Sequence, residues 1–186
     1  MQSYKTILLA IIMMLVSSAV LAQEPEKKQV PQAKTQSISD LKMMAGDWNG
    51  TGWIIWGRER KTFSINETLS FKLGGALLVV EGLGREMIDG KVTDKIIHQA
   101  YGVFKNDPDS GGVGFRFYKE NGNEGFTLIK VDGMKVEWGF TDPASGSEII
   151  FKESYSEDGV WEETGEVKPK GSERWIQFFY MKLTKK

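Results

Sequence analysis

The 186-residue chain contains no cysteine, a single histidine and five prolines. Without cysteine there are no disulfides to stabilise the fold, so its stability depends on packing. The same absence excludes zinc sites built on thiolates, cysteine nucleophiles and a lipid-modified cysteine at a processing site. With only His98 available, most hydrolytic triads are also excluded, and there is no Gly-x-Ser-x-Gly turn to carry a nucleophilic serine.

The sequence has no strong excess of either charge, because it contains 24 basic and 25 acidic residues. The short lysine runs lie near the two ends of the chain, where they are typical of solvated tails. We therefore expect no nucleic-acid partner. Gly82-x-Gly84 opens no helix and is not a dinucleotide loop, and no spacing of side chains indicates a metal site or another cofactor.

The first 22 residues have the layout of a secretory signal peptide. Lys5 precedes an apolar stretch from Ile7 to Val16, and Val20 and Ala22 fit the small-residue positions before a cleavage site, so the mature chain is expected to begin at Gln23. The apolar stretch is too short to serve as a stable membrane anchor. We expect an exported protein, periplasmic or secreted. Residues 23–37 are expected to form a disordered linker, and residues 38–186 a single domain.

The domain is predicted to be all-β, with one short N-terminal helix. Ser37 and Asp40 have the spacing of a capping box before Leu41, and the helix should end at Gly46. Ten short apolar or alternating segments follow. They cover residues 47–57, 61–73, 76–87, 92–104, 112–119, 124–131, 134–141, 147–155, 160–167 and 173–184.

The breaks between these segments predict tight antiparallel hairpins. Asp89-Gly90, Asp132-Gly133 and Asp158-Gly159 supply the positive φ angles that two-residue turns need. Alternation gives several segments one apolar face; one example is the set Trp175, Gln177, Phe179 and Met181. No helix of crossover length intervenes, so we predict an antiparallel up-and-down β-barrel of about ten strands, with a two-sheet sandwich as the alternative.

The segment Gly46-Asp-Trp48-Asn-Gly50-Thr-Gly52 resembles the opening of lipocalin-like, or calycin-type, exported barrels, and in particular the Gly-x-Trp-x-Gly-x-Gly opening of nitrobindin-type haem barrels. Leu73–Leu78, His98–Val103 and Trp161–Glu166 look like uncharacterised exported lipocalin-like families. The resemblance implies that Trp48 closes one end of the barrel and that a late arginine, here Arg174, packs across its ring. The glycines at 50 and 52 should let a neighbouring strand approach closely.

Four side chains are candidates for contact with a ligand. Arg116 and Tyr118 alternate with phenylalanines, and fatty-acid-binding barrels hold a carboxylate with such a pair; the alternative is an arginine that faces solvent. Glu67 lies on an apolar face, so it is either an internal polar group or the sign of a bulge, and Glu81 raises the same question. His98 is either a ligand contact or a hydrogen-bonded wall residue.

These patterns predict an exported barrel that binds a small, largely apolar, fatty-acid-like ligand. One alternative is an enzyme, an isomerase or hydrolase, that uses a cavity carboxylate as its base. Another is a haem-binding barrel. The last segment, where the nitrobindin-type histidine lies, contains no histidine, so His98 would have to serve from another strand. The sequence leaves the oligomeric state open.

Overall fold

A computed structural model describes residues 36–118 and 122–186. The expected signal peptide, residues 1–22, and all but the last two residues of the expected linker, 23–37, lie outside the described residues. The elements in chain order are η1 (Ile38–Leu41), β1 (Gly46–Trp56), β2 (Glu59–Lys72), η2 (Leu73–Gly75), β3 (Leu77–Ile88), β4 (Lys91–Asp107), β5 (Gly112–Tyr118), β6 (Glu124–Asp132), β7 (Lys135–Thr141), β8 (Glu148–Tyr155), β9 (Val160–Lys168) and β10 (Ile176–Lys185).

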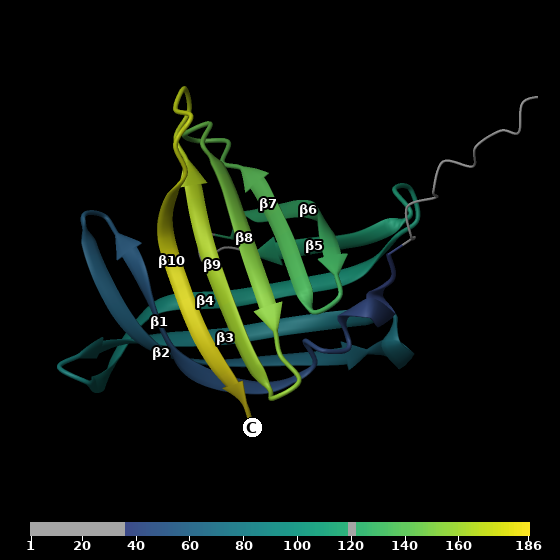
Figure 1. Ribbon diagram of the computed structural model, residues 1–186, viewed down its shortest axis with the longest axis horizontal. Helices are drawn as coiled ribbons and strands as arrows, with labels where there is room; N and C mark the ends of the chain where they lie inside the picture. Colours follow the sequence, from purple (N-terminus) through teal and green to yellow (C-terminus); the bar gives the residue numbers. More distant parts are fainter. Residues whose placement is uncertain (1–35, 119–121) are drawn as a thin grey trace, which may run out of the picture. The chain divides into compact units, whose positions relative to one another are not determined.

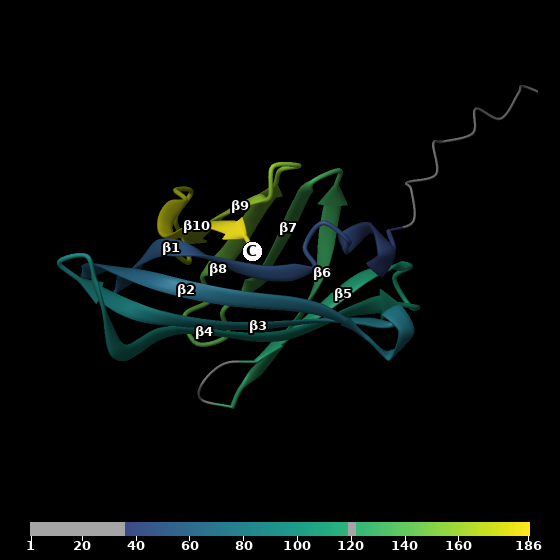
Figure 2. The same cartoon turned by 90° about the horizontal axis from the view of Figure 1, so that it is seen from below.

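The ten strands form a closed antiparallel barrel in which each strand pairs with its neighbours in sequence and β10 returns to pair with β1 (Figure 1). The predicted up-and-down barrel is confirmed, and the two-sheet sandwich is excluded. The long strands β2, β3 and β4 run across the direction of β7 to β9, as both views show (Figure 2). Tight turns support this order: Asp89 and Gly90, for example, both have positive φ, at 51° and 76°.

The predicted short N-terminal helix is wrong in type and in length. The capping box of Ser37 and Asp40 is present, but it begins a single 3₁₀ turn over Ile38–Leu41, and no described residue lies in an α-helix. The hydrogen bonds that follow, from Met44 to Leu41 and from Ala45 to Lys42, also span three residues, so the chain stays in tight turns until β1 begins at Gly46. Ile38 and Leu41 are both buried against the barrel core.

Alternation along the strands decides which side chains fill the barrel. On β2, Phe63, Ile65 and Leu69 are at most 2% exposed, while the residues between them are more exposed. Close approach at the first strand depends on glycine. A Cβ at Gly50 would lie 2.1 Å from the carbonyl oxygen of Lys182, and one at Gly52 would lie 2.4 Å from that of Tyr180. The expected role of these two glycines is confirmed.

Strand β10 departs from the predicted alternation of Trp175, Gln177, Phe179 and Met181. Gln177 pairs with Glu166 and Phe179 pairs with Gly165, so Phe178 is an extra residue in a β-bulge. The bulge changes the face of the strand, which leaves Trp175 and Gln177 exposed while Phe179 and Met181 are buried. Phe178 and Phe179 consequently both line the interior cavity.

Within residues 36–118 and 122–186, no helix is long and apolar enough to cross a membrane.

Candidate functional site

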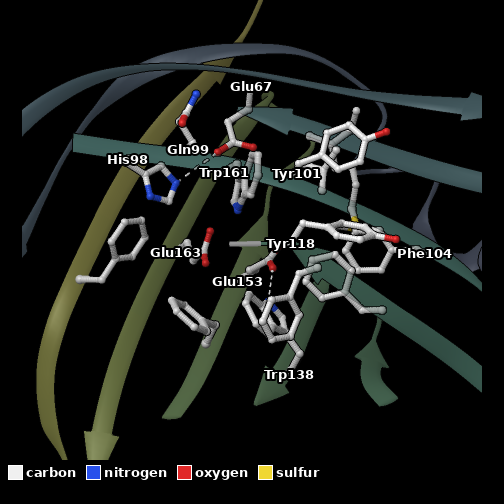
Figure 3. A pocket seen from close by; sticks show the side chains of 18 of the residues that line it. Glu67, His98, Gln99, Tyr101, Phe104, Tyr118, Trp138, Glu153, Trp161 and Glu163 are labelled. Carbon is white, nitrogen blue, oxygen red and sulfur yellow. Dashed lines mark hydrogen bonds and ion pairs between the residues drawn. The ribbon is translucent and has the colours of Figure 1, made fainter. Parts of the chain in front are cut away.

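The barrel encloses a cavity of about 580 Å³ whose wall is mostly aromatic (Figure 3). Eleven aromatic side chains line it: Tyr101, Phe104, Phe115, Phe117, Tyr118, Trp138, Phe140, Phe151, Trp161, Phe178 and Phe179. The polar lining residues are Glu67, His98, Gln99, Glu153 and Glu163, together with the two tyrosine hydroxyls. The volume is within the range of small-molecule pockets, and so is the combination of an apolar wall with few polar groups.

Trp48, near the start of β1, is 1% exposed and is not among the residues that line the cavity. Its ring nitrogen donates a hydrogen bond to the carbonyl oxygen of Met44 at 2.8 Å, and its ring makes edge contacts with Tyr155 and Trp161, both at 5.8 Å between centroids. Because Met44 follows η1 directly, this contact ties the N-terminal turn to the barrel.

The cation beside the Trp48 ring is Lys185 and not Arg174. The Lys185 ammonium lies 5.1 Å from the ring centroid, because the antiparallel register pairs Trp48 with Lys185 at the end of β10. Arg174 precedes β10, which begins at Ile176 and therefore has its start at the opposite end of the barrel. A cationic side chain from near the C-terminus does lie over the Trp48 ring, as expected. Because β1 and β10 are antiparallel, it comes from the end of β10 and not from the segment before it.

Glu67 is an internal carboxyl that is 3% exposed. No bulge interrupts the pairing of β2 with β1 or β3, so its position on the apolar face is genuine, while Glu81 faces outward and is exposed. Gly82, directly opposite on β3, makes room for it: a Cβ at that position would lie 2.5 Å from Glu67 Oε1. The absence of one side chain therefore accommodates the buried carboxyl.

His98 lies next to this carboxyl. Its Nε2 is 3.8 Å from Glu67 Oε1, and its ring packs against Phe63 and Phe179 at centroid distances of 5.7 Å and 5.4 Å. Gly84 allows this approach, since a Cβ there would lie 2.9 Å from the Cβ of His98. The two glycines of Gly82-x-Gly84 thus make space for the two polar side chains that the sequence singled out.

Glu153 and Glu163 join Glu67 in the cavity, and the sequence analysis did not identify either. Glu153 is 5% exposed and accepts hydrogen bonds from the Tyr155 hydroxyl at 2.5 Å and from the Trp138 ring nitrogen at 2.8 Å. Burial raises the pKa of Glu153 to about 7; the two hydrogen bonds act in the opposite direction, and the charge of Glu67 adds to the increase.

Glu163 is 7% exposed and has no hydrogen bond or ion pair with any residue that the structure describes. Burial raises the pKa of this carboxyl well above its ordinary value, and the charges of Glu153 and Glu67 raise it further. Burial likewise raises the pKa of the Tyr155 hydroxyl, with Glu153 as the next cause. The site therefore holds three neighbouring carboxyls, of which Glu153 and Glu163 hold their protons more tightly than an ordinary glutamate.

Alternation of inward-facing and outward-facing residues along β8 and β9 is the sequence pattern that identifies Glu153 and Glu163 as internal. Phe151, Glu153 and Tyr155 alternate along β8, and Trp161, Glu163 and Gly165 alternate along β9, with the acid between inward-facing neighbours in both strands. The same reasoning that identified Glu67 applies to both residues. Glu162, next to Glu163, points outward and pairs with Lys182 at 2.7 Å, so the two adjacent glutamates lie on opposite faces of β9.

Arg116 and Tyr118, expected to bind one ligand together, lie in different places. Arg116 forms an ion pair with Glu124 at 2.5 Å on the outside of the barrel while Phe115 and Phe117 point inward, which is the solvent-facing alternative. Tyr118 lines the cavity, is 40% exposed, and packs against Tyr101 at 5.7 Å. Glu67, His98 and Tyr118 therefore share one cavity, and Arg116 lies outside it.

The surroundings of His98 do not fit histidine-ligated haem. Its Nε2 faces the Glu67 carboxyl, so an iron bound there would bring a porphyrin against buried acidic groups. Among residues 36–118 and 122–186, no group of three or more His, Asp or Glu side chains is arranged to hold a metal ion.

Comparison with known proteins bears on the fold alone. No family model and no curated protein matches the sequence. Among solved structures, Rv2717c from M. tuberculosis resembles this chain with a TM-score of 0.58 at 13% sequence identity, over 80% of this chain and 96% of that one. The chain is therefore a closed ten-stranded antiparallel β-barrel protein with a structural neighbour that shares its fold.

Proposed function

We propose that this protein binds a small, largely apolar ligand inside its barrel, which is of the calycin type. The observation that carries the proposal is the cavity of about 580 Å³, walled by aromatic rings, with its polar groups gathered around Glu67, Glu153 and Glu163. A pocket of this kind takes up the apolar body of a ligand by burial of its surface and orients the ligand through a few polar contacts.

The fatty-acid version of the hypothesis has little support. Arg116, the expected carboxylate partner, lies outside the cavity, and no lysine or arginine is found among the described residues that line it. A fatty-acid carboxylate that entered head first would meet three buried acids instead. The apolar part of the ligand fits the wall, whereas a carboxylate head does not fit the polar end.

Two measurements test the proposal. Native mass spectrometry and solvent extraction of protein purified from its own cells should reveal a retained small molecule, and titration with octylamine or 1-octanol should change tryptophan fluorescence saturably.

Val80 lines the cavity and the adjacent Val79 does not. Val80→Trp should therefore abolish binding while Val79→Trp retains it. The proposal is wrong if no molecule is retained and no probe gives a saturable signal.

A second candidate function is general acid–base catalysis in the same cavity. The observation in its favour is the pKa of Glu153, raised to about 7 by burial, which suits a group that both accepts and donates a proton near neutrality. An isomerase or hydrolase activity that is lost in Glu153→Gln, with binding of the ligand retained, would support catalysis over simple binding.

Export is part of the proposal, and it rests on the sequence. Lys5, the following apolar stretch and the small residues before Gln23 favour a cleaved signal peptide. N-terminal sequencing of the protein from the periplasm or culture medium should begin at Gln23. Recovery of the intact chain from the cytoplasm alone would contradict export without affecting the binding proposal.

A further inference from the structure

The cavity holds three carboxyls, and two of them, Glu153 and Glu163, have no lysine, arginine or histidine partner among the described residues. Glu67, Glu153 and Glu163 come from β2, β8 and β9, and Figure 3 shows their carboxyl groups directed toward a common space. Of the described residues that line the cavity, only His98 can carry positive charge, and it lies 3.8 Å from Glu67. Carboxyls outside the cavity are compensated differently: Glu124, Glu162 and Glu166, for example, each pair with a lysine or arginine.

Two unpartnered polar groups indicate that this space is built for a ligand. Glu163 is 93% buried, lines the cavity and has no hydrogen bond to a described residue. Trp161, two residues earlier and 3% exposed, also lines the cavity, and its ring nitrogen is a buried donor without an acceptor. A buried donor without an acceptor is rare and costs free energy, and the unpaired carboxyl of Glu163, which lines the same cavity, adds to the case for a ligand.

We propose that the polar end of the ligand is a protonated amine that bonds to Glu163 and is stabilised by the nearby carboxyls of Glu153 and Glu67, with an acceptor oxygen beside the nitrogen to take the Trp161 N–H. This inference rests on the proposed function, because it names the class of ligand for the same cavity. An ammonium group has three N–H donors and no acceptor, so it can bond several carboxylates at once.

The energetics favour this class over the alternatives. A cation removes the mutual repulsion of the carboxyls and replaces part of the hydration that burial took from them, whereas a carboxylate adds a further negative charge. A neutral alcohol can hydrogen-bond but leaves the charges uncompensated. The apolar remainder of the ligand packs against rings such as Phe151 and Phe179, and an aromatic wall also attracts a nearby cation.

The test compares three ligands that share one apolar chain: octylamine, 1-octanol and octanoate. Titrations of the purified full-length protein at pH 7.5 should give octylamine at least about tenfold tighter binding than 1-octanol, and octanoate the weakest. 1-Amino-2-octanol, which adds the acceptor oxygen, should bind more tightly than octylamine, and Trp161→Phe should remove that advantage.

Adjacent glutamates on β9 provide matched variants. Glu163→Gln should weaken octylamine binding about tenfold or more while changing 1-octanol binding little. Glu162→Gln, one residue away and pointing outward to Lys182, should leave both affinities unchanged. The ranking of ligands on the unmodified protein does not depend on any variant folding correctly.

The outcomes separate the two proposals. If 1-octanol or octanoate binds as tightly as octylamine, the amine assignment is overturned while the barrel remains a binding protein. If none of the four compounds binds and no molecule is retained on purification, the proposed function itself fails. If 1-amino-2-octanol has no advantage over octylamine, the role given to Trp161 is overturned.

Discussion

Two places in this barrel bury glutamate, and they treat its charge in opposite ways. Glu86 on β3 is 8% exposed and has ion pairs with Lys61 at 2.8 Å and with Lys95 at 3.2 Å. The hydrogen bonds from these lysines lower its pKa. In the cavity, Glu153 and Glu163 have similarly low solvent exposure, but they lie deeper in the protein and have no cation, and burial raises the pKa of both.

The comparison shows that burial alone does not decide the state of a carboxyl. At Glu86 the chain supplies its own counterions, so the charge is compensated within the fold and the group has a structural role. In the cavity the counterion is missing although Lys and Arg are available elsewhere in the sequence. A site whose charge is left uncompensated in this way is a site where a ligand has the most to contribute.

The largest expected effect is on the pH dependence of stability. Glu153 has an ordinary pKa of 4.5 and a folded value of about 7, so the folded state holds its proton more tightly. Its contribution is fully present below pH 4.5 and is lost as the pH rises through 7. The free energy of unfolding should therefore fall by roughly 2–3 kcal/mol between pH 5 and pH 8. Urea unfolding at both pH values measures this, and a flat or rising profile would contradict the account.

Glu163→Gln should stabilise the protein at pH 8 by about 1–3 kcal/mol, because a neutral amide avoids the cost of a buried, unpaired carboxyl. The gain should shrink as the pH falls and disappear well below pH 4.5, where the carboxyl is protonated in the folded and unfolded states alike. Thermal melts at pH 5 and pH 8 follow the effect, with Glu162→Gln as the control. A variant that gains stability and loses amine binding would show the trade-off typical of functional sites; a loss of stability at pH 8 would not fit an unpaired charge.

Glu86→Gln should have the opposite sign. Removing the partner of Lys61 and Lys95 should lower stability modestly at neutral pH, where the carboxylate is paired. Since the pKa of Glu86 is lowered by these lysines, its contribution is present above pH 4.5 and is lost as the pH falls through the folded value. Melting curves of the variant and the unmodified protein should therefore converge in acid. Equal stability at pH 7 would contradict the contrast.

Gly82→Ala is expected to have the smallest effect on folding. The three heavy atoms nearest the new Cβ would all belong to the Glu67 carboxyl, the end of a flexible side chain, so stability should change by less than about 1 kcal/mol. The displaced carboxyl should nevertheless weaken octylamine binding several-fold, as measured by the same titrations. Unchanged affinity would show that Glu67 takes no part in holding the amine.

The sequence was sufficient to predict the barrel. Turn residues such as Asp89-Gly90 and Asp132-Gly133 separate the strands, and all ten expected segments are strands whose ends lie within a few residues of those predicted. These signals are local, so they can be recognised from short stretches of the chain. The β10 bulge at Phe178 was not recognisable, because it depends on pairing with β9 and not on the residues of β10 alone.

The site was predicted only in part, for a geometric reason. Alternation placed Glu67 inside and also applies to Glu153 and Glu163, but the meeting of these three carboxyls in one cavity depends on closure of the barrel. The cation over the Trp48 ring is Lys185 and not the expected Arg174 for the same reason. The register between β1 and β10 decides which residue of the last strand lies beside Trp48, and this register exists only in the closed barrel.

The most direct test of the uncompensated carboxyl cluster is the number of protons exchanged when octylamine binds. Isothermal titration calorimetry at pH 7 in two buffers with different enthalpies of ionisation measures that number. A cation that draws charge onto Glu153 and Glu163 must displace their protons, so we predict net proton release together with an affinity that rises between pH 6 and pH 8. Binding with no proton exchange, or with proton uptake, would contradict the account.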